Sequence, residues 1–99
     1  MPVYLLLSTL STHGVECVVE NPSCLRQISM DIENLGVKVL GQYATLGQYD
    51  FVHVIEAPDN ETVARVSMEL IAQGHLKPLS LPTISINDFI SRLSLDRQP

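Results

Sequence analysis

The sequence predicts a single α+β domain whose strands and helices follow the order βαββαβ. Residues 3–8 and 51–55 are the most continuously apolar runs of the chain, as expected of the inner strands of a sheet. Apolar residues recur at spacings of three and four in 22–35 and 60–73, the period of an amphipathic helix. This order is that of the split βαβ, or ferredoxin-like, fold, a two-layer sandwich with both helices on one face of a four-stranded antiparallel sheet.

The first 36 residues contain one strand, one clear helix and a stretch with two interpretations. The strand at 3–8 is followed by residues 15–19, which fit either a helical turn or irregular structure. Asn21 is the expected N-cap of the first clear helix, with Pro22 at its first position, where proline is pre-organised. Gly36 is expected to end that helix.

Residues 37–46 are predicted to form a strand that pairs with the strand at 51–55 in a hairpin whose corner is 46–50. Strand alternation places Val39 and Tyr43 on one face, and Gly41 marks the position of a β-bulge. The other face takes Leu40, Ala44 and Leu46.

The strand at 51–55 leads directly into the second helix. Pro58 stops the strand because it has no amide hydrogen to donate. Asp59 is the expected N-cap of a helix at 60–73, and Gly74 is expected to end it.

The last strand, at 76–86, is predicted to lie at an edge of the sheet. Pro78 and Pro82, four residues apart, would point their missing donors in the same direction, which suits an edge better than a centre. Asn87 or Asp88 is expected to cap a short closing helix.

Composition predicts one domain over residues 1–99 and an association with a second copy. The hydrophobic fraction is 45% and the mean hydropathy is +0.19, which is apolar for so short a chain. Two helices cover only one face of the sheet, so apolar residues on the other face need a second cover. A second copy of the same sheet is the simplest cover, and we expect a homodimer or a higher homo-oligomer.

Charge and patterning disfavour several other partners. The net charge of −5, with 11 acidic and 6 basic residues and no basic run, lacks the footprint that nucleic acid requires. The chain also shows no membrane span or signal peptide, so we expect a cytoplasmic protein. Cys17 and Cys24 match no zinc or redox spacing, and free thiols are the expectation.

His53 is the strongest candidate for chemistry, because it is the only histidine within a predicted strand. Alternation puts its imidazole on the face of Phe51 and Ile55. If that face points into a barrel, His53 acts as a general base or a ligand near neutral pH. The alternative is a histidine packed in an interface. His13 and His75 lie in loops without ligand spacing, so we expect no metal site and no cofactor.

Tyr49 and Asp50, which immediately precede the same strand, complete the predicted catalytic group. They would orient a substrate proton at the rim of a pocket whose ligand-binding residues include Tyr43, Phe51 and Tyr4. A structural interpretation competes with this role: Asp50 would bond the amides of its own turn, and Tyr49 would pack over the hairpin.

The corner Gly47-Gln48-Tyr49-Asp50 resembles the GYD family of short proteins. The likeness includes Asn21-Pro22, the run from Gly36 to Val39, and the unit from Tyr49 to Asp59. The resemblance implies a dimeric α/β barrel without an established activity. The chain departs from the family pattern at Ser11–His13 and in its proline-bearing last strand.

Two classes of function follow from these features. The first is a homo-oligomer that binds a small organic ligand, with a cofactor-independent isomerase or monooxygenase-like enzyme using His53 as base as its catalytic form. The second is a non-catalytic regulatory or structural oligomer.

Overall fold

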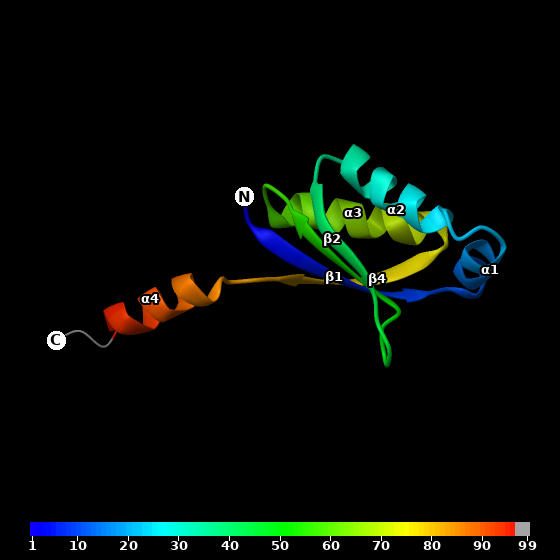
Figure 1. Ribbon diagram of the computed structural model, residues 1–99. Coiled ribbons are helices and arrows are strands. Elements are labelled where there is room, and N and C mark those ends of the chain that lie inside the picture. Colours follow the sequence, from blue (N-terminus) through cyan, green and yellow to red (C-terminus); the bar gives the residue numbers. More distant parts are fainter. Residues whose placement is uncertain (97–99) are drawn as a thin grey trace.

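The computed structural model describes residues 1–96, and the predicted ferredoxin-like α+β fold is confirmed. The elements are β1 (Val3–Leu10), α1 (Thr12–Glu20), α2 (Cys24–Asn34), β2 (Lys38–Ala44), β3 (Phe51–Glu56), α3 (Asn60–Gln73), β4 (Leu76–Pro82) and α4 (Ile86–Asp96). The antiparallel sheet has the order β2-β3-β1-β4, so β1 and β3 are inner strands and β4 is an edge, as predicted. Figure 1 shows α2 and α3 side by side on one face of this sheet.

The stretch between β1 and α2, for which the sequence allowed two interpretations, forms a helix, α1. This helix adds an element to the predicted order. Ser11 is its N-cap, and the Ser11 hydroxyl accepts a hydrogen bond from the Gly14 N–H at 2.9 Å. Gly14 is buried, and the Ser11 N–H donates to the His75 carbonyl at 3.0 Å. The start of α1 therefore packs on the corner between α3 and β4.

The prediction that Asn21 caps α2 is wrong, because α2 begins later, with Ser23 as N-cap. The Cys24 N–H donates to the Asn21 carbonyl at 2.9 Å, and the Ser23 hydroxyl donates to Asn21 Oδ1 at 2.6 Å. These bonds hold a turn around Pro22 that delays the helix. The predicted end is confirmed, since Gly36 has a φ of +95° just past α2.

The limits of α3 are as predicted. The Asp59 side chain accepts from the Thr62 N–H at 2.8 Å, and Gly74 ends the helix in the left-handed conformation. The predicted bulge is also confirmed, because the β2–β3 register shifts between Val39 and Gly41. That shift corrects one placement: Val39 pairs with buried Ile55, whereas Tyr43 pairs with Val52 and points to the opposite face.

The last strand is shorter than predicted and its helix begins elsewhere. β4 ends at Pro82, and the Thr83 N–H donates to the Val3 carbonyl at 3.2 Å. The Asp88 N–H donates to the Ser85 hydroxyl at 3.1 Å, so Ser85, rather than Asn87 or Asp88, supplies the cap of α4. In Figure 1, α4 stands beyond the end of the sheet, away from the other helices.

The core lies between the sheet and the helix pair α2 and α3. The side chains of Leu6, Ile32, Ile55 and Val66 are fully buried. No helix in residues 1–96 combines the length and the apolar character that crossing a membrane requires.

The other side of the sheet, which we call the open face, is apolar and lacks a cover among the described residues. Strand register places Leu5, Val54 and Leu81 side by side on it, and likewise Leu7, Val52 and Leu79. Tyr43 extends the open face onto β2 and is 61% exposed. A face of this composition is typical of a contact surface.

Candidate functional site

His53 lies in the middle of β3 and faces the helix layer rather than the open face. It pairs with buried Leu6 on β1 and with Gln42 on β2. The side chain is 1% exposed, and neither ring nitrogen has a hydrogen-bond partner among the described residues. Burial lowers the pKa of His53 below its ordinary value of 6.5, so the imidazole is neutral at pH 7. The ring is thus in the form of a base, in a place that solvent does not reach.

Asp50 connects the hairpin corner to the end of the first strand, and this replaces the predicted turn contact. Its Oδ2 accepts from the Leu10 N–H at 2.8 Å, and its own N–H donates to the Ser8 carbonyl at 2.9 Å. The corner is instead closed by Thr45, whose N–H donates to the Asp50 carbonyl and whose hydroxyl donates to the Tyr49 carbonyl. The Asp50 carboxylate therefore has a structural partner 40 residues away.

The predicted ligand-binding residues lie on two sides of the sheet. Tyr4 and Phe51 are buried under the helices, on the same face as His53, whereas Tyr43 is exposed on the open face. Within one chain, Tyr43 and His53 therefore cannot line one pocket. Two clefts among the described residues are lined by other side chains and include none of His53, Tyr49, Asp50, Tyr43 and Phe51.

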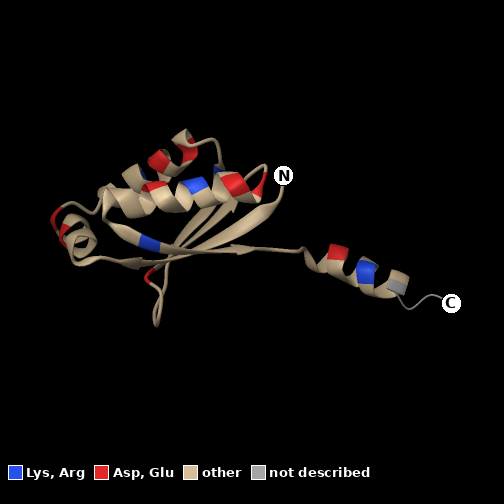
Figure 2. Ribbon diagram, turned by 180° about the vertical axis from the view of Figure 1, so that it is seen from behind, with Lys and Arg blue, Asp and Glu red and all other residues tan. Residues whose placement is uncertain are grey.

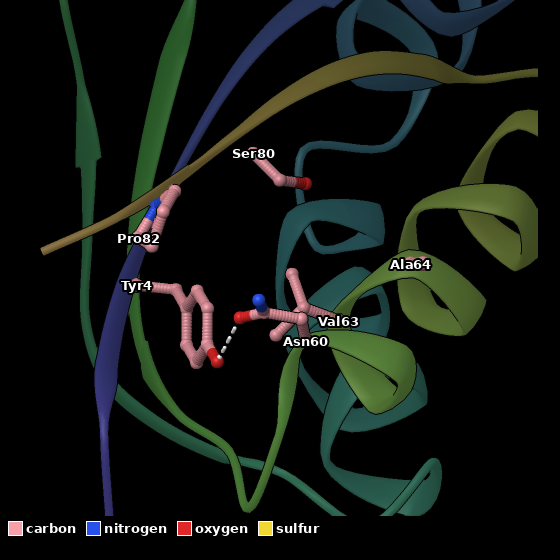
Figure 3. Close-up of a pocket in the computed structure, with 6 residues that line it drawn as sticks. All are labelled: Tyr4, Asn60, Val63, Ala64, Ser80 and Pro82. Atoms are coloured by element: carbon pink, nitrogen blue, oxygen red, sulfur yellow. Dashed lines mark hydrogen bonds between the residues drawn. The ribbon is translucent and has the colours of Figure 1, made fainter.

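Tyr4 lines the first of these clefts, between α3 and the β1–β4 pair. The Tyr4 hydroxyl donates to Asn60 Oδ1 at 2.6 Å, as Figure 3 shows. The cleft is about 180 Å³ and is mostly apolar. Its walls are formed by Tyr4, Asn60, Val63, Ala64, Ser80 and Pro82.

A second cleft, of about 480 Å³, lies where the β1–α1 corner meets the α3–β4 corner. Ser11, Gly74 and Lys77 are among its lining residues. Beside it, the rings of His13 and His75 stack with centroids 5.3 Å apart. The sequence did not predict this site, because it depends on Leu10 and Leu76 being paired in register.

The cysteines and acidic groups do not assemble into a further centre in residues 1–96. Cys17 and Cys24 are free thiols, as predicted, and burial together with the neighbouring Cys17 raises the pKa of Cys24 to about 11. A protonated thiol is a poor nucleophile at neutral pH. No group of three or more histidine, cysteine, aspartate or glutamate side chains there is placed to hold a metal ion.

Charge separates the two sides of the molecule. Helices α1 to α3 carry six acidic side chains against two basic ones, and Figure 2 shows the acidic residues spread along them. The acidic residues are Glu16, Glu20, Asp31, Glu33, Glu61 and Glu69, and the basic ones are Arg26 and Arg65. On the open face, strand register places Lys38 opposite Glu56, and Lys77 opposite Thr9. The open face is therefore the side with the least negative charge.

Replacing Asp50 by alanine should lower the free energy of unfolding by about 1–3 kcal/mol, because the partly buried Leu10 N–H loses its carboxylate partner. Urea unfolding monitored by circular dichroism measures this loss. Asp50→Asn is the matched control, since its amide oxygen can still accept the bond, and we expect less than half the loss. Equal stability of Asp50→Ala and the wild type would show that this bond contributes nothing.

The fold and its surfaces define the class of this molecule: a small ferredoxin-like α+β module with one helix-covered face and one open face. A family model described as the GYD domain matches residues 4–93, and the chain belongs to the GYD domain family. The resemblance seen at the corner of residues 46–50 is thereby confirmed.

Two comparisons with individual proteins add to this assignment. The chain is 44% identical over 94 residues to "Glutamine synthetase and cystathionine beta-lyase binding protein" of Thermus thermophilus, covering 94% of this chain and 99% of the relative. It is also similar to the crystal structure of TTHA0845, a protein from the same organism, with a TM-score of 0.56, 18% identity, and coverage of 86% of this chain and 95% of that chain. At that identity, the second likeness supports the fold alone.

Proposed function

We propose that this protein is a non-catalytic binding module whose partners are metabolic enzymes, with glutamine synthetase and cystathionine beta-lyase as the first candidates. The main support for this proposal is the similarity to a relative that is named as a binding protein for these two enzymes. The match covers 99% of the relative, so the relative consists almost entirely of this kind of domain. The named binding is therefore a property that such a domain can have without a second one.

The positions of the polar candidates support a binding role over a catalytic one. The Asp50 carboxylate accepts a hydrogen bond from the Leu10 N–H, and His53 is buried beneath the helices. Tyr43 lies on the other side of the sheet from His53. Of the groups that the sequence proposed for one pocket, Asp50 makes a structural contact, and His53 and Tyr43 lie on opposite sides of the sheet.

The outer surface of the helix layer is the surface we assign to the enzyme partner. Met30 on α2 and Met68 on α3 are 55% and 66% exposed, and methionine is common at surfaces that adapt to partners. Acidic side chains on the same helices include Glu33, Glu61 and Glu69. Apolar side chains bordered by charged ones match the general anatomy of protein interfaces, and the charge would select a basic patch on the enzyme.

Purified glutamine synthetase from the organism that encodes this protein should bind it saturably in biolayer interferometry. The double variant Glu61→Lys/Glu69→Lys should weaken binding at least about tenfold, because it reverses the charge of α3. Raising the salt concentration should weaken the wild-type complex by screening the same charges.

Glu16→Lys/Glu20→Lys is the matched control, with the same charge change on α1. We expect its affinity to stay within about twofold of the wild type. Absence of saturable binding to both enzymes at about 100 μM would refute the proposed function. Equal weakening by both double variants would refute the assignment to α3.

We also propose that two copies associate through the open face, in a homodimer that acts in the cytoplasm. The apolar residues of β1, β3 and β4 on that face support association, because nothing in residues 1–96 covers them. Light scattering on the intact protein tests this, and a monomer of 11.0 kDa at about 100 μM would contradict it.

Binding of a small apolar ligand is a second candidate function, favoured by the cleft at Tyr4. A volume of about 180 Å³ suits a fragment-sized molecule, with the Tyr4 and Asn60 polar atoms at one end. A panel of small phenols should raise the unfolding temperature of the wild type more than that of Ala64→Phe, which fills the cleft wall. Equal shifts would place binding elsewhere.

The enzymatic form of this second candidate uses His53 as base in a cofactor-independent reaction. It requires the substrate to reach a side chain that is 1% exposed, so the helix layer would have to open. Turnover that survives in His53→Ala would exclude it.

A further inference from the structure

The C-terminal helix α4 has an apolar stripe that is not buried by any of residues 1–96. Ile86, Phe89, Ile90 and Leu93 follow the spacing i, i+3, i+4, i+7 and therefore share one side of the helix. Phe89 is 48% exposed and Ile90 is 54% exposed. Ser91 and Arg92 lie toward the other side of the helix.

A helix of this size needs a packing partner. α4 has 11 residues, and isolated helices shorter than about 12–15 residues are marginal in water. None of residues 86–95 is buried, and the molecule extends over 61 Å because α4 stands apart from the sheet. A surface that stabilises α4 is therefore not found within residues 1–96 of its own chain.

The connection to β4 holds this helix outside the domain. Thr83 is tied to β1, since both its N–H and its hydroxyl donate to the Val3 carbonyl, the latter at 2.6 Å. Ser85 already caps α4. Only Ile84 separates these two fixed points, so the helix continues beyond the sheet as a short arm, residues 83–96 (Figure 1).

The open face offers a surface of matching chemistry and size. It is apolar across β3, β1 and β4, and the described part of the chain does not cover it. Strands of six to eight residues are roughly 20–27 Å long, and an 11-residue helix is about 16 Å long, so α4 fits along the face. Each molecule thus carries one uncovered helix stripe and one uncovered sheet face.

Charge identifies a second copy of the chain, approached on this face, as the occupant. Two copies that each carry a net charge of −5 repel one another when their acidic helix layers meet. The open face has Lys38 and Lys77 with Glu56 as its acidic neighbour, so contact through this face lessens that repulsion. The α4 stripe that would meet this face consists of Ile86, Phe89, Ile90 and Leu93, none of which is charged.

We propose that residues 83–96 form an exchange arm, in which the Ile86-Phe89-Ile90-Leu93 stripe of α4 packs on the open face of a second copy. The exchange is reciprocal, so each copy covers the other in a two-fold dimer. The inference rests on the proposed homodimer and specifies how its two chains contact one another.

Cross-linking between two differently labelled chains tests the contact directly. In a Cys17→Ser/Cys24→Ser background, one isotope-labelled chain carries Ile90→Cys and the unlabelled chain carries Leu7→Cys on the open face. A short bis-maleimide should join labelled α4 to unlabelled β1, as identified by mass spectrometry. Ser91→Cys, on the opposite side of α4, is the matched control, and we expect at least fivefold less product from it.

A second measurement separates this inference from the dimer and from enzyme binding. Phe89→Asp/Ile90→Asp should weaken self-association at least tenfold in sedimentation equilibrium, whereas Ser91→Asp should leave it unchanged. Both residues are exposed in the single chain, so circular dichroism should show an intact domain. A dimer that persists in the double variant or yields no labelled cross-link would overturn the arm and leave the dimer standing. A monomeric wild type would overturn both, whereas enzyme binding is measured independently.

Discussion

Gly14→Ala should lower the free energy of unfolding by about 2–3 kcal/mol, even though alanine is the better helix former. A Cβ at this position would lie 2.2 Å from the His75 carbonyl oxygen and 3.1 Å from Leu10 Cδ2. The carbonyl belongs to the backbone, so the contact is relieved only by moving α1 away from the α3–β4 corner. Thermal unfolding should show a decrease of about 10–20 °C for a domain of this size.

Val15→Ala is the control for this prediction. Val15 is the next residue on α1 and is 46% exposed, so its truncation should change stability by less than about 0.5 kcal/mol. If Gly14→Ala unfolded at the wild-type temperature, the close approach of α1 to His75 would be absent in solution.

Acid should destabilise the protein through His53. Burial lowers the pKa of His53 in the folded state. Below pH 6.5 the imidazole is therefore protonated in the unfolded chain while it stays neutral in the folded chain. The contribution of His53 is therefore fully present above pH 6.5, and it is lost as pH falls from 6.5 to the lowered folded-state pKa. The slope approaches about 1.4 kcal/mol per pH unit within this window.

His53→Leu tests the origin of this slope. Leucine removes the ionisable group and two ring nitrogens without partners, so the variant should be at least as stable as the wild type at pH 5. Urea unfolding at pH 5, 6, 7 and 8 measures both proteins. An unchanged slope in His53→Leu would assign the acid sensitivity to other groups.

Local chemistry explains why much of the fold was predictable. Asp59 and Gly74 limit α3 through a side-chain cap and a left-handed residue, both of which act within a few residues of the chain. The continuous apolar runs of β1 and β3 can also be read along the chain, and they indicated inner strands. The starts of α2 and α4 were predicted wrongly because more than one polar residue near each start can serve as the cap, and the local turn geometry selects Ser23 and Ser85.

The candidate site was predictable only in part. The sequence singled out His53 and Asp50 as residues of interest. It did not predict which face of the sheet His53 occupies or which residue Asp50 contacts. Asp50 reaches Leu10, a residue 40 positions away, because the hairpin corner lies beside the end of β1. The α1 contact at His75 and the second cleft likewise depend on the pairing of β1 with β4.

The sequence by itself determined the order of all elements except α1, the sheet topology and the family, because these depend on periodicity, caps and a short motif that are read along the chain. Only the tertiary structure decided which face each strand residue occupies. A one-residue bulge between Val39 and Gly41 reverses the side of Tyr43, and the register of β3 places His53 under the helices. It also decided that α4 stands apart from the sheet, since packing between distant segments is not encoded in any local pattern.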